Sequence, residues 1–148
     1  MSVDNLLVRK LKTEDAKDIS RIYSSITQKS VMTDFKRIIE EIAQKEENAC
    51  FVAEFQSRVV GFMISHAPAG GFGIEKSAWI TMVGVDPKFM GEGIGNRLAE
   101  EVFKCYKTRG IKNIYTTVRW FYGDLMSFFK SLGFDKSDFV NLHKVLDD

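Results

Sequence analysis

Apolar residues recur with two different periods along the chain, and these periods predict its secondary structure. Short runs in which apolar residues are continuous or alternate with polar ones are expected to be strands; they are residues 6–10, 49–55, 58–66, 79–85, 111–118 and 140–146. Longer stretches with apolar residues every three to four positions are expected to be helices; they are residues 13–23, 35–42, 94–108 and 124–132. The order β-α-α-β-β-β-α-β-α-β predicts an α/β fold with helices on both faces of a twisted sheet.

Local signals support the boundaries of several elements. Thr13 and Asp34 belong to the residue types that cap helix N-termini, so they are expected to cap the first two helices. Gly110 is placed to end the third helix. Only Gln56 and Ser57 separate the second strand from the third, which predicts a hairpin with a tight turn. No linker or repeat divides the chain, so residues 1–148 are expected to form a single domain.

The composition excludes several kinds of partner. With 21 Lys and Arg against 20 Asp and Glu, the net charge of +1 gives no electrostatic basis for binding nucleic acid or an anionic membrane. No apolar run approaches the roughly 18 residues of a membrane span, and residues 1–5 lack the basic and apolar segments of a signal peptide. We therefore expect a cytoplasmic protein. Cys50 and Cys105 lie far apart and no His or Cys residues cluster, which predicts two buried free thiols and no metal site.

The most informative stretch is residues 80–98, where a buried strand is followed by Asp-Pro, three alternating glycines and a helix. Gly91, Gly93 and Gly95 let the backbone approach a phosphate, and the first N–H groups of the helix lie at its positive end without partners. A phosphorylated small molecule is therefore the expected ligand. A P-loop would need Lys-Ser or Lys-Thr after the glycines, and a dinucleotide-binding domain would need an acid about 20 positions later; the chain has neither.

Residues 85–98, Val-Asp-Pro-Lys-Phe-Met-Gly-Glu-Gly-Ile-Gly-Asn-Arg-Leu, resemble the pyrophosphate loop of the GNAT acyltransferase superfamily, which reads Gln/Arg-x-x-Gly-x-Gly/Ala after Val-x-Pro. Residues 128–134, Phe-Phe-Lys-Ser-Leu-Gly-Phe, resemble the family's Phe-Tyr-x-x-Leu-Gly-Phe segment, and residues 7–16 resemble its first strand and helix. The resemblance covers most of the chain. It implies a mixed, mostly antiparallel sheet that splays open at its central strands, and acetyl-coenzyme A as cosubstrate.

The resemblance also implies which residues hold the cosubstrate. The pyrophosphate is expected on main-chain N–H groups of the loop and helix start, at Met90, Gly91, Glu92, Gly93, Ile94, Gly95 and Asn96. The pantetheine is expected along the central strand, where an N–H polarises the thioester carbonyl, at Val83, Gly84 and Val85. Phe129 is expected to contact the cosubstrate as well, and Lys130 is expected to reach one of its phosphates unless it is a solvated lysine on the helix surface. The loop departs from the family pattern at Met90, which replaces Gln or Arg, and at Glu92, where a basic residue is common.

The catalytic groups of the family are missing from their usual positions. Thr81 stands where the histone-acetylating members carry a general base Glu, and Phe129 stands where a Tyr often protonates the leaving thiolate. Substitutes for the base are Glu75, before the central strand, and Glu54, at the end of the second strand; a solvated surface carboxylate is the other interpretation of each. Tyr122, before the last helix, is the substitute for the acid, unless it belongs to an aromatic cluster that covers the sheet edge.

Other side chains also allow two interpretations. His66 is a residue type that titrates near neutral pH, but a hydrogen-bonded histidine at a strand end explains it as well. His143 has the same two interpretations. Large aromatic residues near glycine-rich loops often line binding pockets, and core packing explains them equally well; here they are Phe72, Trp79, Trp120 and Phe121.

Together these features predict an N-acetyltransferase that moves an acetyl group directly from acetyl-coenzyme A to a primary amine. The amine belongs either to a small molecule or to a protein, on a lysine or the N-terminus. The missing Glu and Tyr leave an alternative open, a catalytically weak module of the same fold that binds acyl-coenzyme A as a sensor or regulatory partner. A dinucleotide-binding protein is disfavoured by the glycine spacing. Either a monomer or a homodimer is expected.

Overall fold

A computed structural model describes residues 5–27, 34–68, 75–118 and 123–147 of the chain. It divides into two compact units, Met1–Thr117 and Val118–Asp148. The first unit contains the whole sheet and most of the helices, and the second contains one helix followed by an extended segment. No helix of the described residues is long and apolar enough to cross a membrane.

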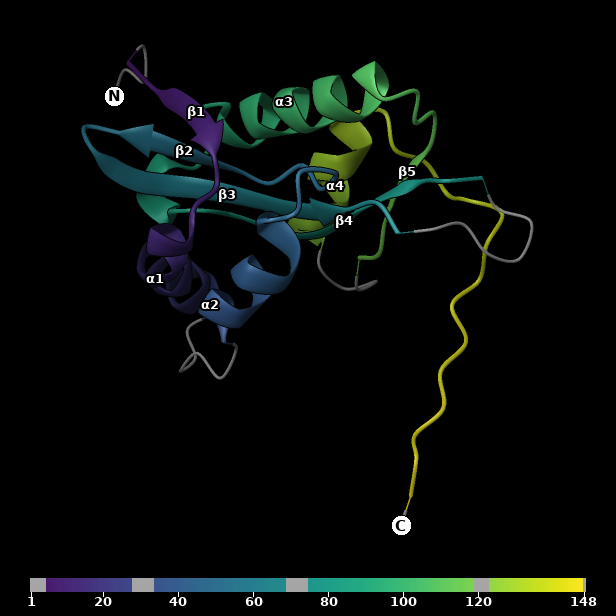
Figure 1. Ribbon diagram of the computed structural model, residues 1–148. Helices are drawn as coiled ribbons and strands as arrows, with labels where there is room; N and C mark the ends of the chain where they lie inside the picture. The colour runs from purple at the N-terminus through teal and green to yellow at the C-terminus, as the bar shows by residue number, and fades with distance from the viewer. Residues whose placement is uncertain (1–4, 28–33, 69–74, 119–122, 148) are drawn as a thin grey trace. The chain divides into compact units, whose positions relative to one another are not determined.

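The first unit is built on a five-stranded sheet whose strands lie in the order of the sequence. The strands are β1 (Leu7–Lys10), β2 (Phe51–Phe55), β3 (Arg58–His66), β4 (Ala78–Val85) and β5 (Ile114–Thr116). Neighbours from β1 to β4 pair antiparallel, and β4 pairs with β5 in parallel, as Figure 1 shows. The predicted α/β class with a mixed, mostly antiparallel sheet is therefore confirmed.

The predicted hairpin between β2 and β3 is present. Gln56 and Ser57 form its turn and both have positive φ, 51° and 65°. Two consecutive left-handed residues give the primed type of turn, whose twist matches the right-handed twist of the flanking strands. The hairpin therefore forms without glycine at either central position.

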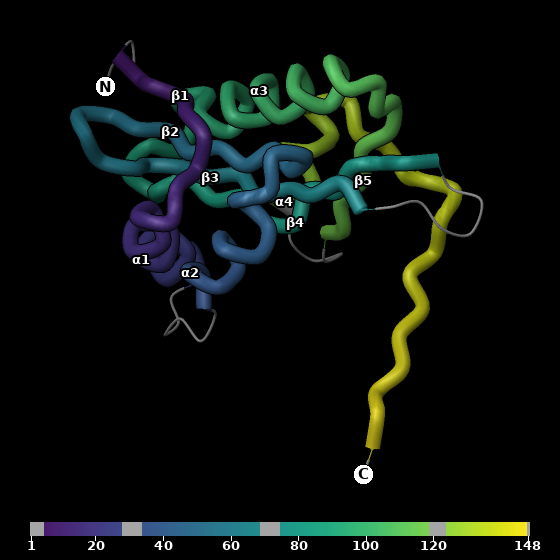
Figure 2. Tube along the Cα trace, viewed as in Figure 1, coloured from purple at the N-terminus to yellow at the C-terminus, as the bar shows by residue number. Residues whose placement is uncertain are grey.

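Helices cover both faces of the sheet, as the sequence predicts. The helical segments α1 (Ala16–Thr27), α2 (Phe35–Ile38) and the π-helical turn η2 (Ile39–Ala43) lie on one face, and α3 (Ile94–Thr108) lies on the other (Figures 1 and 2). Apolar side chains from the first group pack against the strands in a buried cluster that includes Ile19, Ile22, Phe35, Ile39, Val52, Phe62 and Ile64. On the opposite face, a Cβ added to Gly61 would lie 2.9 Å from Cγ2 of Ile94, so β3 and α3 approach closely there.

The caps of the first two helices differ in outcome. Asp34 accepts a hydrogen bond from the N–H of Arg37 at 3.1 Å, which confirms it as an N-cap. Thr13 was the wrong choice for the first helix. A short 3-10 turn, η1 (Thr13–Asp15), precedes α1, and it brings the carboxylate of Asp15 to the N–H of Lys12 at 2.8 Å. Thr13 instead accepts a hydrogen bond from Gln44 at 2.8 Å.

The second unit contains α4 (Gly123–Ser131), which begins one residue before the predicted helix. Within this unit Phe129 is buried, and its ring lies 5.2 Å from each of the rings of Phe128 and Phe134. The predicted strand over residues 140–146 is wrong, because these residues have no strand structure. A strand needs a paired neighbour, and the described part of this unit has none.

The two cysteines are free thiols, as predicted, although Cys105 is only half-buried. Burial raises the pKa of the Cys50 thiol to about 11, although the thiol donates a hydrogen bond to the carbonyl of Ser65 at 3.3 Å. At pH 8 roughly one Cys50 in a thousand is then a thiolate, the reactive form. We expect a disulfide reagent such as DTNB to label Cys105 in the native protein and Cys50 only after unfolding. Peptide mapping checks this, and a Cys105→Ser variant that still reacts within minutes would contradict it.

Candidate functional site

The glycine loop joins the end of β4 to the start of α3. After Val85 the chain forms a short 3-10 turn, η3 (Pro87–Phe89), which the side chain of Asp86 caps by accepting a hydrogen bond from the N–H of Lys88 at 3.0 Å. Gly91 and Gly93 then adopt left-handed backbone conformations, with φ of 82° and 79°. A Cβ at either position would meet no atom within 4 Å. The glycines thus serve the turn and leave open space beside it.

Free backbone donors face this loop at the start of α3. The N–H of Arg97 is the first to bond within the helix, to the carbonyl of Gly93 at 3.1 Å. The N–H groups of Ile94, Gly95 and Asn96 therefore lie ahead of the helical ladder, and no described side chain caps them. They lie at the positive end of a helix of 15 residues. Open space beside several N–H donors fits a diphosphate well.

Two side chains of the loop add no donor to this set. Met90 is 56% exposed, and Glu92 is half-buried in the loop. A thioether supplies no donor, and a carboxylate is only an acceptor at neutral pH. At these two positions, only the main chain can donate to an anion.

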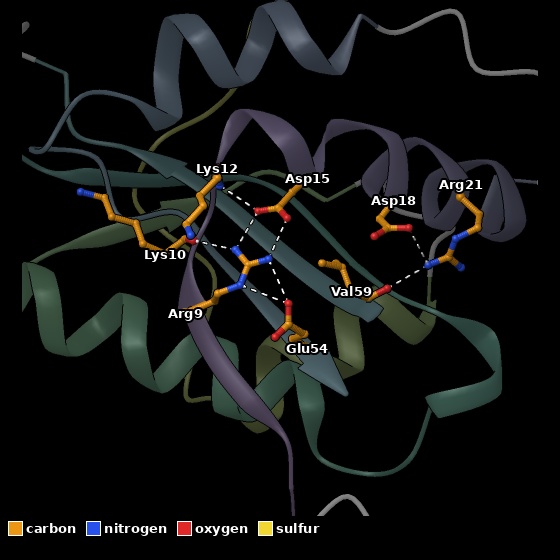
Figure 3. A network of polar contacts seen from close by, with 8 residues as sticks. All are labelled: Arg9, Lys10, Lys12, Asp15, Asp18, Arg21, Glu54 and Val59. Atoms are coloured by element: carbon orange, nitrogen blue, oxygen red, sulfur yellow. Dashed lines mark hydrogen bonds and ion pairs between the residues drawn. The ribbon is translucent and has the colours of Figure 1, made fainter. Parts of the chain in front are cut away.

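A partly buried ion pair lies at the entrance of the loop. Nη1 of Arg21, on α1, lies 3.0 Å from Oδ2 of Asp86, which is 10% exposed. Arg21 also donates to the carbonyl of Val59 at 2.8 Å and lies 3.5 Å from Asp18 (Figure 3). Burial raises the pKa of Asp86, but hydrogen bonds from Lys88 and Arg21 lower it more, so the pKa lies below its ordinary value. Sequence reasoning missed Arg21, because 65 residues separate it from Asp86.

The edge of β4 that faces away from β3 carries unpaired backbone groups. Successive residues of an antiparallel strand turn these groups alternately to one side and the other. The N–H of Asp86 donates to the carbonyl of Val60 on the β3 side at 2.8 Å, and β4 pairs regularly with β3 just before it. Val83 and Val85 therefore turn their N–H groups away from β3.

A bulge at Thr81 and the shortness of β5 together expose that edge. Ile64 pairs with Met82 and Ser65 with Ile80, so Thr81 is an extra residue in β4. The pairing of β4 with β5 ends at Ile80, and no described strand pairs with β4 beyond it. The predicted splaying of the central strands corresponds to this interruption. The free edge ends at Val85, and the glycine loop and α3 follow it along the chain.

The candidate bases lie in different surroundings. Glu54 accepts hydrogen bonds from Arg9, whose guanidinium also forms a two-bond ion pair with Asp15 at 2.8 and 2.9 Å (Figure 3). Glu75 is exposed ahead of β4. Thr81 is exposed and donates to the carbonyl of Ile64 at 3.1 Å. None of these three side chains is hydrogen-bonded to the glycine loop. The roles of Glu54 and Glu75 as bases stay predictions, and Thr81 has no carboxylate with which to serve as one.

The remaining candidate site residues lie in the second unit or outside the described residues. Phe129 and the exposed Lys130 belong to α4 in the second unit. Other aromatic candidates lie outside the described residues; they are Phe72, Trp120, Phe121 and Tyr122. The described residues contain no cluster of His, Cys, Asp or Glu that would hold a metal ion.

A surface groove of about 480 Å³ lies at the other end of α3, lined by Phe103, Tyr106 and residues of the loop before β5. The glycine loop precedes the first residue of this helix, whereas the groove begins near its last two turns. A helix of this length is roughly 20 Å long. The groove is therefore separate from the backbone donors of the loop.

Comparison with known proteins decides the family. A model of the Acetyltransferase (GNAT) family matches residues 16–134, which include the glycine loop, α3 and α4. The chain belongs to the GNAT acetyltransferase family. The resemblance seen in the loop and in residues 128–134 is thereby confirmed.

Individual relatives differ in how much they share with this GNAT chain. A mycothiol acetyltransferase from Amycolatopsis mediterranei (strain U-32) is 30% identical over 105 residues, which are 69% of this chain and 35% of that protein. The chain thus spans about a third of the length of this relative.

Solved structures share the fold over nearly the whole chain. The aminoglycoside acetyltransferase meta-AAC0020 from an uncultured soil metagenomic sample, in complex with sisomicin, matches with a TM-score of 0.80, 19% identity and coverage of 99% and 100% of the two chains. Aminoglycoside N-acetyltransferase AAC(6')-Iy in complex with CoA matches with a TM-score of 0.80 and 15% identity, and the match covers 95% of this chain and 94% of that one. A ribosomal-protein-alanine N-acetyltransferase from Brucella melitensis biovar Abortus 2308 matches with a TM-score of 0.75 and 14% identity, and the match covers 96% of this chain and 99% of that one. At these identities the fold is what they share.

Proposed function

We propose that the protein is an acetyl-coenzyme A-dependent N-acetyltransferase that acts on a primary amine. The observation that carries this proposal is a pair of donor sets that are consecutive along the chain, the N–H groups of Val83 and Val85 on the free edge of β4 and those at the start of α3. Coenzyme A has a diphosphate and an extended amide-containing arm, and these two donor sets suit the two parts. Among proteins of this fold, AAC(6')-Iy has been crystallised with CoA.

The strand edge also supplies the electrostatic part of the reaction. When an amine attacks a thioester, negative charge develops on the carbonyl oxygen. A main-chain N–H aimed at that oxygen stabilises the charge without rearrangement, which typically accelerates such reactions 10²–10³-fold. Val83 is our candidate for this donor, because its N–H leaves the β3 ladder just after the bulge. A main-chain donor needs no particular side chain, which fits the apolar sequence of β4.

Proton transfer needs other groups. An alkyl ammonium with a pKa of about 10.4 is neutral in only about one molecule in 2,500 at pH 7, so the acceptor needs a base or a desolvating pocket. Glu75 and Glu54 remain candidates for that base, and Tyr122 for the acid that protonates the thiolate. Phe129 has no proton to donate. A thiol with a pKa of about 8.5 leaves readily, so the missing acid slows the reaction without preventing it.

The acceptor belongs to one of two groups, small molecules or proteins. The relatives include acetyltransferases named for mycothiol, aminoglycosides and a ribosomal protein alanine. These names span both groups, so they support a primary amine without selecting one. The alternative, a weakly catalytic module that binds acyl-coenzyme A as a sensor, is supported by the same cosubstrate site together with Thr81 and Phe129 at the usual catalytic positions.

Isothermal titration with acetyl-coenzyme A, beside NAD as a control, tests the proposal first. Saturable binding of acetyl-coenzyme A alone is the expected result, and the absence of binding would overturn the proposed function. A second assay then follows release of the coenzyme A thiol in the presence of diverse primary amines. Binding without amine-dependent release of thiol would favour the sensor module over the enzyme.

A further inference from the structure

Three side chains form a row across one face of the sheet, next to the free edge of β4. His66 of β3 pairs in register with Trp79 of β4, and Trp79 pairs in register with Tyr115 of β5. Residues paired across neighbouring strands project from the same face, so the three side chains lie side by side. The rings of Trp79 and Tyr115 are stacked, with centroids 4.9 Å apart and 28° between their planes.

The face is the one that carries α1 and α2. Phe62 and Ile64 belong to the buried cluster beneath these helices. Every second residue of a strand projects from the same face, so His66 lies on that face too. Unlike those two residues, His66, Trp79 and Tyr115 are only half-buried. The row therefore continues the covered face into a partly open one.

His66 lacks the hydrogen bond that a structural histidine at a strand end usually makes. Its Nδ1 atom is buried and has no hydrogen-bond partner among the described residues. Leaving a buried polar atom unpaired costs stability, so this nitrogen needs a partner that the described residues do not supply. Burial alone lowers the pKa of His66 below its ordinary value of 6.5, which keeps the ring neutral at pH 7.

The groups around His66 carry no charge that would stabilise a protonated ring. Across the strands it faces Trp79, and the adjoining amide of Asn48 is engaged by the N–H of Ala67 at 3.0 Å. The Cys50 thiol, with its pKa of about 11, is neutral. The π-helical turn η2 contacts β3, and its carboxylates, Glu40 and Glu41, are exposed. Glu75, which precedes β4, is exposed too.

We propose that His66, Trp79 and Tyr115 form the wall of the acceptor site, and that His66 takes the proton from the acceptor's ammonium group. This inference rests on the proposed function. The row ends where β4 leaves β5, and Trp79 precedes Val83 by four residues, roughly 13 Å along an extended strand. An acceptor whose body lies on the aromatic rings extends along the free edge toward the thioester, with the proton passing to His66 along a chain of waters.

The reaction then balances without a further reactant. The ammonium gives one proton to the neutral imidazole, and the free amine attacks the thioester carbonyl. The new C–N bond forms, the C–S bond breaks, and the departing thiolate takes the second proton that the nitrogen loses. The imidazolium afterwards releases its proton to water. The net products are an amide, coenzyme A thiol and one proton.

The chemistry of the row selects a class of amine. Two stacked aromatic rings beside a neutral imidazole favour one ammonium group carried on an apolar or aromatic body, which binds by apolar contact and cation–π attraction. A polycation would need several carboxylates, and the row contributes none. The inferred substrate class is therefore a monoamine with an apolar or aromatic body, rather than a polyamine.

Steady-state acetylation of 2-phenylethylamine, with spermidine as the polycationic comparison, tests the inference. We expect His66→Asn to lower kcat about 100-fold at pH 7 and to remove the acid limb of the pH profile of kcat/KM. Trp79→Leu should raise the KM for 2-phenylethylamine about tenfold. Neither variant should change the Kd for acetyl-coenzyme A. His143→Asn is the matched control, because it replaces the other histidine, which is exposed, and it should behave as the wild type.

The outcomes separate this inference from the function beneath it. If the wild type binds acetyl-coenzyme A but acetylates spermidine better, or acetylates neither amine, the inference is overturned and the cosubstrate site stands. If His66→Asn keeps the wild-type pH profile, His66 is not the proton acceptor. If His66→Asn is unstable, as judged by its Tm, His66→Gln gives the same comparison. Failure of the wild type to bind acetyl-coenzyme A would overturn both proposals.

Discussion

Replacing Gly93 with aspartate is expected to weaken acetyl-coenzyme A binding by at least about 100-fold, or about 2.8 kcal/mol. Two effects act together. A carboxylate at the N-cap of α3 accepts hydrogen bonds from the first N–H groups of the helix, so these are lost to the phosphates. Its negative charge also repels the diphosphate across a short distance. Each charge-assisted hydrogen bond lost contributes about 1.5–3 kcal/mol.

The chain offers a matched control for this variant. Gly110 ends α3 and has φ of 78°, almost the same as the 79° of Gly93, and a Cβ at either position meets no atom within 4 Å. Gly110→Asp therefore adds the same side chain and the same backbone strain at the far end of the same helix. Isothermal titration should show near wild-type affinity for Gly110→Asp. Equal losses in both variants would attribute the effect to strain and place the diphosphate elsewhere.

The features that sequence reasoning predicted best are those coded by neighbouring residues. The three alternating glycines after Asp86-Pro87 predict a turn and a helix start together, and the structure has both. The turn at Gln56 and Ser57 was predicted because nothing else separates two apolar runs. In each case a few consecutive residues contain all the information about the local backbone.

The features that were missed depend on contacts between distant residues. The bulge at Thr81 exists only in the register between β3 and β4, and single-strand periodicity carries no trace of it. The same holds for the alignment of His66, Trp79 and Tyr115, which needs three strands to be placed. The strand predicted over residues 140–146 fails for the converse reason. Alternating apolar residues permit a strand, but a paired neighbour is what forms one.

The ion pair between Arg21 and Asp86 shows how such a distant contact supports the site. It connects α1 to the residue that caps η3, immediately before the glycine loop. Of the two side chains, Arg21 is 30% exposed and Asp86 10% exposed. Removing the arginine leaves a buried carboxylate without its ion-pair partner, although the N–H of Lys88 remains. Loss of one member of such a pair costs far more than the pair contributes over an apolar replacement.

We therefore expect Arg21→Ala to lower the free energy of unfolding at pH 7 by about 2–4 kcal/mol. Urea unfolding followed by circular dichroism measures this. Arg37→Ala is the matched control, since its ion pair with Glu41 is also on a helix but leaves the two side chains 75% and 61% exposed. An exposed pair is screened by water and contributes little to stability. Similar losses in both variants would mean that the arginine side chain, rather than the buried charge, accounts for the effect.

The pH dependence of the Arg21→Ala effect separates charge from packing. The pKa of Asp86 in the folded protein lies below its ordinary value, so the unfolded chain binds the proton more tightly. Stabilisation by the ionised carboxylate is then complete above the unfolded pKa of about 3.9 and is lost as the pH falls through the lower folded pKa. The difference between wild type and Arg21→Ala should accordingly be constant from pH 7 to 5 and shrink toward pH 3. A difference that stays the same at pH 3 would show that Arg21 stabilises the loop entrance through its contact with the Val59 carbonyl, and Asp86→Asn would then be nearly neutral.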